Sequence, residues 1–196
     1  MIEIIKGGKT FYWKGKYHEN MIGRDTLSTE LNVLEKFNPI INSEFSSSEI
    51  ILLGNLHPLV QNTVINQCSN PHRFIILDTM NFWMDNALNE LKDVIEKVDL
   101  IIINDEEAQQ LTSESNIFNA GNKILKMGPK KVIIKKGEHG SIYLDSFHKY
   151  ILPACPVDSL VDPTGAGDSY AGGIAGFLST KQEIGYNEIK EAMLFG

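Results

Sequence analysis

The chain has 196 residues, 42% of them hydrophobic, and a formal net charge of −7. This composition predicts one globular domain with a sizeable core, and the acidic balance argues against nucleic acid as the main partner, because phosphate backbones are bound by basic surfaces. No segment approaches the roughly 18 apolar residues of a membrane helix, and Met1 leads into Ile2 to Ile5 without the pattern of a signal peptide. We therefore expect no membrane partner and a cytoplasmic protein in which Cys68 and Cys155 are reduced thiols.

The first 49 residues are predicted to form a small β region followed by a connector. Within residues 1–20, the segments Ile2 to Ile5 and Thr10 to Trp13 are alternating or rich in aromatic residues, which predicts short antiparallel strands. Residues 21–49 are polar and contain chain breakers, so they are predicted to be an irregular connector, with some helix allowed between Leu27 and Phe37.

From residue 50 to residue 196, apolar runs alternate with helical segments. The predicted strands are Ile50 to Leu53, Phe74 to Leu77, Leu100 to Ile103 and Val132 to Ile134, with helices between them and near residues 165–176 and 187–196. Continuous apolar runs separated by helices indicate a parallel sheet covered on both faces. The expected fold class is therefore α/β, a doubly wound and mostly parallel sheet. Two shorter strands, Ser141 to Leu144 and Tyr150 to Leu152, are predicted to form an antiparallel hairpin.

Residues 161–176 read V-D-P-T-G-A-G-D-S-Y-A-G-G-I-A-G and carry the strongest functional signal. Proline predicts a turn, and the small residues after it leave the backbone amides of Gly165, Ala166 and Gly167 accessible at the start of a helix. Such amides, together with the positive end of the helix dipole, bind anions. Asp168 lies in the first helical turn, where it is either a base beside the bound anion or a partner of the dipole; the small neighbours favour the base.

Asn104 and Glu107 follow the strand predicted at residues 100–103 and lie one helical turn apart on one face. One interpretation is that the amide and the carboxylate hold the water molecules of a magnesium ion, which prefers oxygen ligands and keeps part of its hydration shell. The other is an N-cap asparagine followed by acidic residues in the first turn. Spacing alone favours the cap.

Two further segments also have two interpretations. Gly137 and Gly140 either let a nucleotide lie against the backbone or supply positive φ angles to a hairpin turn. Asp162 and Thr164 either offer oxygen atoms to a monovalent cation or cap and brace the turn, and the cap is favoured. The sequence contains neither a P-loop motif nor a G-x-G-x-x-G dinucleotide fingerprint.

Residues 162–173, D-P-T-G-A-G-D-S-Y-A-G-G, resemble the C-terminal signature of the ribokinase-like, or pfkB, carbohydrate kinase family. The segment Asn104 to Glu107 is similar to the N-x-x-E motif of that family, and Gly137 to Gly140 resembles its glycine loop on the nucleotide side. The three motifs follow one another in the order that the family has, which makes the resemblance specific.

The resemblance implies transfer of the γ-phosphoryl group of ATP to a hydroxyl of a sugar or nucleoside. Asp168 would be the general base, and the amides of Gly165, Ala166 and Gly167 would form the anion hole. Residues 1–20 would be part of a β lid over the acceptor. The resemblance assigns nucleotide binding to Asn104, Lys135, Gly137 and Gly140, Mg²⁺ binding through water to Glu107 and Asn104, and K⁺ binding to Asp162 and Thr164.

The chain departs from the family pattern in two respects. Lys135 stands where many members have Thr or Ser. By comparison with the family, the N-terminal third and the C-terminal tail are expected to be missing, so we predict that the chain alone is inactive and that an unpaired sheet edge favours a homodimer. The alternative function is a non-catalytic nucleotide-binding module or an inactive fragment of such a kinase.

Overall fold

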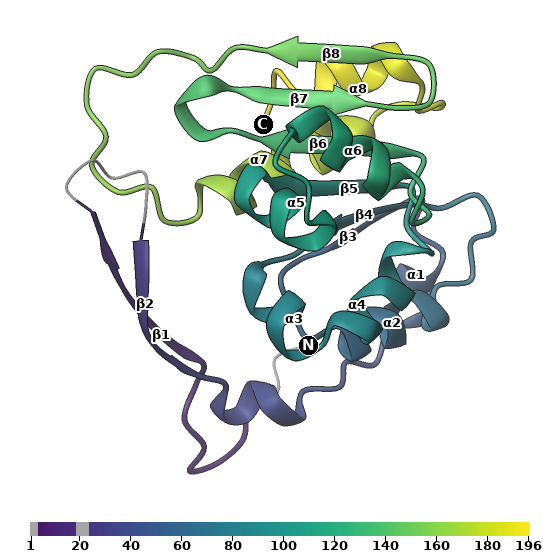
Figure 1. Cartoon of the computed structure of the whole chain (residues 1–196). Coiled ribbons are helices and arrows are strands. Elements are labelled where there is room, and N and C mark those ends of the chain that lie inside the picture. The colour runs from purple at the N-terminus through teal and green to yellow at the C-terminus, as the bar shows by residue number, and fades with distance from the viewer. Residues whose placement is uncertain (1–3, 19–23) are drawn as a thin grey trace.

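Six strands form one sheet in the order β3-β4-β5-β6-β7-β8, and two others form a separate antiparallel sheet (Figure 1). This computed structural model describes residues 4–18 and 24–196. The strands of the larger sheet are β3 (Ile50–Leu53), β4 (Phe74–Asp78), β5 (Leu100–Asn104), β6 (Lys131–Lys135), β7 (Ser141–Leu144) and β8 (Lys149–Leu152). β3 to β6 are parallel, whereas β6, β7 and β8 pair antiparallel. The mostly parallel sheet and the hairpin at its end, both predicted from the sequence, are confirmed.

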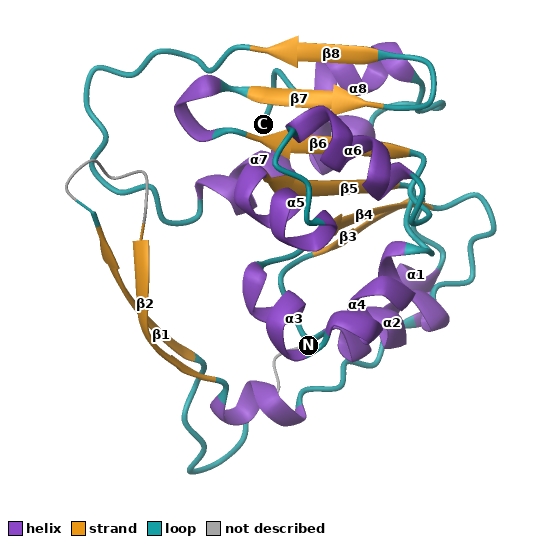
Figure 2. Cartoon of the chain, viewed as in Figure 1, coloured by secondary structure: helices purple, strands orange, loops and turns teal. Residues whose placement is uncertain are grey.

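Helices cover both faces of this sheet (Figure 2). One face packs against α2 (Pro58–Gln67), α3 (Asn81–Asn86), α4 (Leu88–Ile95), α5 (Asp105–Thr112) and α6 (Ile117–Leu125), and the other against α7 (Ala166–Leu178) and α8 (Tyr186–Ala192). Side chains alternate along each strand, so Ile75 and Leu77 enter the first core while Ile76 enters the second. Both faces of β4 are therefore buried, which explains its continuous apolar run and confirms the doubly wound α/β class.

The N-terminal region contains β1 (Tyr12–Tyr17) and β2 (Arg24–Glu30), which pair with each other beside the larger sheet (Figure 1). Two predictions are corrected here. Ile4 and Ile5 lie in no strand, and the rest of the predicted strand Ile2 to Ile5 lies outside the described residues. The predicted connector, residues 21–49, contains the strand β2. This strand is held by its backbone hydrogen bonds to β1 and packs on no core, so its side chains are polar and the sequence shows no apolar strand pattern.

The remaining short elements are a 3₁₀ turn at Asn32–Lys36 and α1 (Ser43–Ser46) before β3, and a 3₁₀ turn at Gly137–His139 between β6 and β7. Along residues 4–18 and 24–196, no helix has both the length and the apolar composition needed to cross a bilayer.

One edge of the larger sheet gathers the ends of several elements. Because β4, β5 and β6 are parallel, their carboxyl ends lie at the same edge, and the two reversals at β7 and β8 bring the end of β8 back to it. Residues 153–165 then run from β8 to α7. This helix begins at the same edge and packs along one face of the sheet (Figure 1). Ligands of open α/β sheets bind at such an edge.

Candidate active site

Three polar residues end neighbouring strands on the face that α7 covers. Asp78 ends β4, Asn104 ends β5 and Lys135 ends β6. Each follows by two positions a residue of the core packed against α7 and α8, namely Ile76, Ile102 and Ile133. Since side chains alternate along a strand, Asp78 and Lys135 are directed to the same side of the sheet as the start of α7, whereas the side chain of Asn104 caps α5.

The turn before α7 is built on a glycine in the left-handed backbone region. Gly165 is the N-cap residue, with φ +81°, and the space where a Cβ would lie is open. A residue other than glycine would be strained at this φ. The amide of Ala166 donates to the carbonyl of Pro163 at 3.2 Å, which fixes the turn, and Asp168 is an exposed carboxylate in the first turn of α7.

Asp162 and Thr164 brace this turn and connect it to the small sheet. The amide of Thr164 donates to Asp162 Oδ1 at 2.8 Å, and hydrogen bonding from Thr164 lowers the pKa of the Asp162 carboxyl. Thr164 Oγ1 lies 2.9 Å from the hydroxyl of Tyr17 in β1. The bracing interpretation is therefore confirmed, whereas the monovalent cation stays a prediction.

Lys135 and Asp78 form an ion pair beside the turn. Lys135 Nζ donates to Asp78 Oδ1 at 3.1 Å, and the side chains of both residues are largely buried, with exposed fractions of 19% and 8%. A Cβ added to Gly167 would lie 3.1 Å from Lys135 Nζ, so the ammonium touches the first turn of α7. Burial raises the pKa of Asp78; the Lys135 ammonium opposes this rise, and the negative charge of Asp168 adds to it.

Asn104 and Glu107 form a capping box at the start of α5. Asn104 Oδ1 accepts from the amide of Glu107 at 2.7 Å, and Glu107 Oε2 accepts from the amide of Asn104 at 2.9 Å. The cap interpretation is thus confirmed. In the part of the chain that the structure describes, no three His, Cys, Asp or Glu side chains cluster as ligands of a metal ion. Magnesium binding through water stays a prediction.

The segment Gly137 to Gly140 joins β6 to β7 at the same edge, and its two glycines differ. Gly137 has φ +54° and open space at its Cβ position. Gly140 has φ +82°, and a Cβ there would lie 2.0 Å from the carbonyl oxygen of Leu152. Gly140 is therefore required by the packing of the loop against the end of β8, and Gly137 is the glycine whose backbone a ligand can approach.

Asp78, which directly follows the predicted strand Phe74 to Leu77, was given no role in the predicted site. Its partner Lys135 is 57 positions away in the sequence, so no local pattern joins them. The alternation of side chains along the strands could have indicated the pair. In both β4 and β6 a polar residue ends the strand two positions after a buried isoleucine, and the two strands flank β5 in the sheet.

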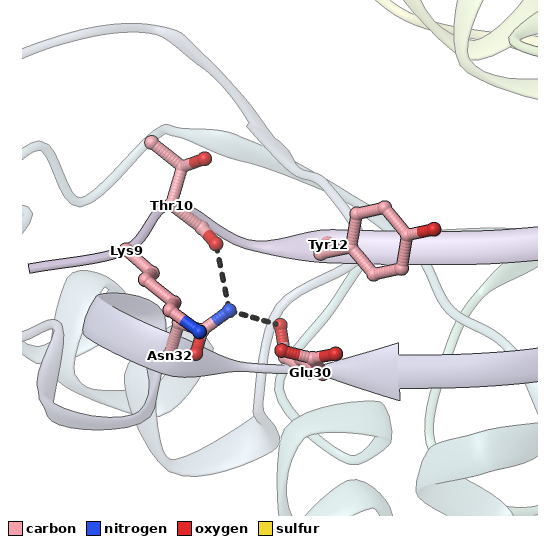
Figure 3. Close-up of a pocket in the computed structure, with 5 residues that line it drawn as sticks. All are labelled: Lys9, Thr10, Tyr12, Glu30 and Asn32. Atoms are coloured by element: carbon pink, nitrogen blue, oxygen red, sulfur yellow. Dashed lines mark hydrogen bonds between the residues drawn. The ribbon is translucent and has the colours of Figure 1, made fainter.

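A surface pocket of about 410 Å³ lies away from these residues, against the small sheet (Figure 3). Its lining residues are Lys9, Thr10, Tyr12, Glu30 and Asn32. The side-chain Nδ2 of Asn32 donates to the backbone carbonyl oxygen of Thr10 at 2.8 Å and lies 3.5 Å from the backbone carbonyl oxygen of Glu30. It therefore joins the two chain segments. None of the predicted site residues lines this pocket, and we do not assign phosphoryl chemistry to it.

The fold is that of ribokinase-like kinases. A ribokinase from Thermotoga maritima superposes with a TM-score of 0.71 at 22% sequence identity, covering 95% of this chain and 60% of that one. A nucleoside kinase from Methanocaldococcus jannaschii gives a TM-score of 0.72 at 17% identity, covering 97% of this chain and 60% of that one.

The sequence comparisons then identify the family. Residues 18–196 match the pfkB family carbohydrate kinase model, and the chain belongs to this family. It is similar to a cytidine kinase from Thermococcus kodakarensis, with 28% identity over 88% of this chain and 63% of the relative. It is also similar to a 2-dehydro-3-deoxygluconokinase from Bacillus subtilis, with 29% identity over 57% of this chain and 36% of the relative. The chain thus spans less than two thirds of the length of these relatives.

Proposed function

We propose that this protein transfers the γ-phosphoryl group of ATP to a hydroxyl group of a sugar or nucleoside. The observation that carries the proposal is the convergence of the Gly165 turn, Asp168 and Lys135 at one sheet edge. Family membership and the names of the relatives, which include nucleoside and sugar-acid kinases, support a small-molecule acceptor.

The residues divide between holding the nucleotide and moving a proton. The acceptor hydroxyl oxygen forms a bond to the γ-phosphorus, the bond from that phosphorus to the β,γ-bridging oxygen breaks, and the hydroxyl proton passes to the carboxylate of Asp168. The exposed position of Asp168 lets a substrate reach it. The amides of Gly165 and Gly167 would stabilise the charge on the phosphoryl oxygens, and the amide of Ala166 would join them by exchanging its 3.2 Å hydrogen bond to Pro163 for one to the phosphoryl group.

Cation binding belongs to the same proposal. Glu107 and Asn104 would contact Mg²⁺ through water. Their mutual hydrogen bonds hold the two side chains in fixed positions at the carboxyl end of β5. The bound Mg²⁺ would neutralise charge on the ATP phosphates. Asp162 and Thr164 would contribute oxygen atoms to a K⁺ site next to the turn. Gly137 would lie against the nucleotide, whereas Gly140 would keep the loop in place.

The test measures ATP binding to the chain by calorimetry, and ADP formation with a panel of sugars and nucleosides by a form as long as the curated relatives, because the chain alone is expected to be inactive. The proposal predicts ATP binding by the chain and acceptor-dependent ADP formation by the longer form. Asp168→Asn should lower turnover by about 100-fold or more, the usual contribution of a general base, with ATP affinity changed less than about twofold. Full turnover in this variant would disprove the role of Asp168. Absence of both ATP binding and turnover would disprove the proposed function.

A second candidate is a nucleotide-binding module without catalysis. The same experiment separates the two candidates, because ATP binding by the chain without ADP formation by the longer form, for any acceptor in the panel, supports the module.

A further inference from the structure

The ion pair of Lys135 and Asp78 lies in surroundings that disfavour the positive charge of Lys135. Lys135 Nζ contacts the first turn of α7, as the 3.1 Å distance to the Cβ position of Gly167 shows. The start of a helix carries partial positive charge, so an ammonium group placed there is repelled. A buried charge also loses its hydration. Something must offset both costs.

Asp78 offsets them in part and fixes the direction of the lysine. Its Oδ1 atom lies 3.1 Å from Lys135 Nζ, and its side chain is 8% exposed at the end of β4. An ammonium group has three donor hydrogens, and Asp78 Oδ1 accepts one of those of Lys135. The anchored ammonium therefore retains donor capacity beside Gly167 in the first turn of α7.

We propose that Asp78 is a positioning residue that holds the Lys135 ammonium against the Gly165–Gly167 turn, where Lys135 contacts the terminal phosphoryl group of ATP. This inference rests on the proposed function and deepens it. Lys135 adds one full positive charge to the partial charges of the turn, and together they match an anion with several charges better than a singly charged one. Because ADP lacks the terminal phosphoryl group that Lys135 contacts, the site should distinguish ATP from ADP through Lys135.

The test compares the dissociation constants of ADP and of β,γ-imido-ATP, measured by calorimetry on the full chain, so no turnover is needed. In Lys135→Met the affinity for the triphosphate should fall by about 10- to 100-fold, the range for one charge-assisted hydrogen bond. The affinity for ADP should change by less than about twofold. Asp78→Asn, which frees the ammonium from its anchor, should lower the triphosphate affinity by a smaller factor.

Two variants separate this role from simple charge compensation. The double variant Asp78→Asn/Lys135→Met removes both buried charges, so it should regain melting temperature relative to Lys135→Met but should not regain triphosphate affinity. Lys130→Met is the matched control, because it removes the cation of another ion pair, 3.2 Å from Asp99, at the opposite edge of the sheet. This control should leave both affinities unchanged.

The outcomes are distinct. If the double variant regains the triphosphate affinity, or if Lys135→Met weakens ADP and the triphosphate equally, Lys135 only compensates Asp78 and the inference is overturned while the proposed function stands. If the unaltered chain binds neither nucleotide, the proposed function fails and this inference fails with it.

Discussion

Replacing each glycine of the β6–β7 loop by alanine should separate the structural glycine from the ligand-facing one. In Gly140→Ala the new methyl group would lie 2.0 Å from the carbonyl oxygen of Leu152 and 2.7 Å from the amide nitrogen of Ala154. Both contacts are to backbone atoms at the end of β8, which cannot rotate away. The backbone at Gly140, with φ 82° and ψ −141°, is also one that alanine rarely adopts.

The magnitude follows from these two costs. Backbone strain of this kind costs about 1–3 kcal/mol, and overpacking costs a further amount of about 1–3 kcal/mol. Gly140→Ala should therefore lower the free energy of unfolding by about 2–6 kcal/mol. Gly137→Ala meets no atom within 4 Å and has φ +54°, so only the left-handed backbone cost of about 1–2 kcal/mol applies.

Urea unfolding, followed by tryptophan fluorescence and by circular dichroism, measures both changes. Gly176→Ala is the control: Gly176 lies inside α7 with open space at its Cβ position, and alanine there should stabilise the protein by about 0.5–1 kcal/mol. Equal destabilisation by Gly137→Ala and Gly140→Ala would show that the contact with β8 does not constrain the loop. Under native conditions Gly137→Ala should lower ATP affinity, since its methyl group enters the space proposed for the nucleotide.

Two further predictions concern regions on either side of the site. Burial would raise the pKa of Asp145, but hydrogen bonds from the Tyr143 hydroxyl and the amides of Phe147 and His148 outweigh burial and lower the pKa to about 2. Because the folded-state pKa is below the unfolded-state value of about 3.9, the ionised carboxylate should contribute about 2 kcal/mol above pH 4, lost between pH 4 and pH 2. Asp145→Asn should remove this contribution, so a variant whose unfolding free energy equals that of the parent at pH 7 would contradict it. In Tyr17→Phe, loss of the 2.9 Å contact with Thr164 should speed hydrogen exchange of the amides of Asp162, Thr164 and Gly165 while overall stability stays the same. Unchanged exchange would mean that the contact does not restrain the turn.

The sequence predicted the larger sheet well because its central strands are buried on both faces. A run such as Leu100 to Ile103 has no polar alternation, and only a covered parallel strand accounts for it. A helix was also predicted between the strands at residues 100–103 and 132–134, and the apolar face of α6 in this interval packs on the sheet. In β2 the corresponding signal is absent: Leu27 is its one large apolar residue and is 57% exposed. Its pairing with β1 depends on partners that no local pattern shows.

The site shows a similar division. The Gly165 turn and the cap formed by Asn104 and Glu107 are local features, so their backbone shapes could be inferred from spacing alone. The contact between Lys135 and Asp78 depends on strand order and on the register of three strands. Strand order became available only with the structure, and for that reason Asp78 remained outside the predicted set.

The double reversal at β7 and β8 also makes the protein convenient to label. The turn between these strands, residues 145–148, opens at the edge opposite to the start of α7, and the side chain of Phe147 in it is 91% exposed. A fluorescent reporter attached through Phe147→Cys, with the exposed thiol of Cys155 removed by Cys155→Ser, would sit on a hairpin that shares the sheet with Lys135 but turns at its opposite edge. Such a reporter offers a fixed reference point from which to measure, by energy transfer, how far Tyr17 and the small sheet move when nucleotide binds.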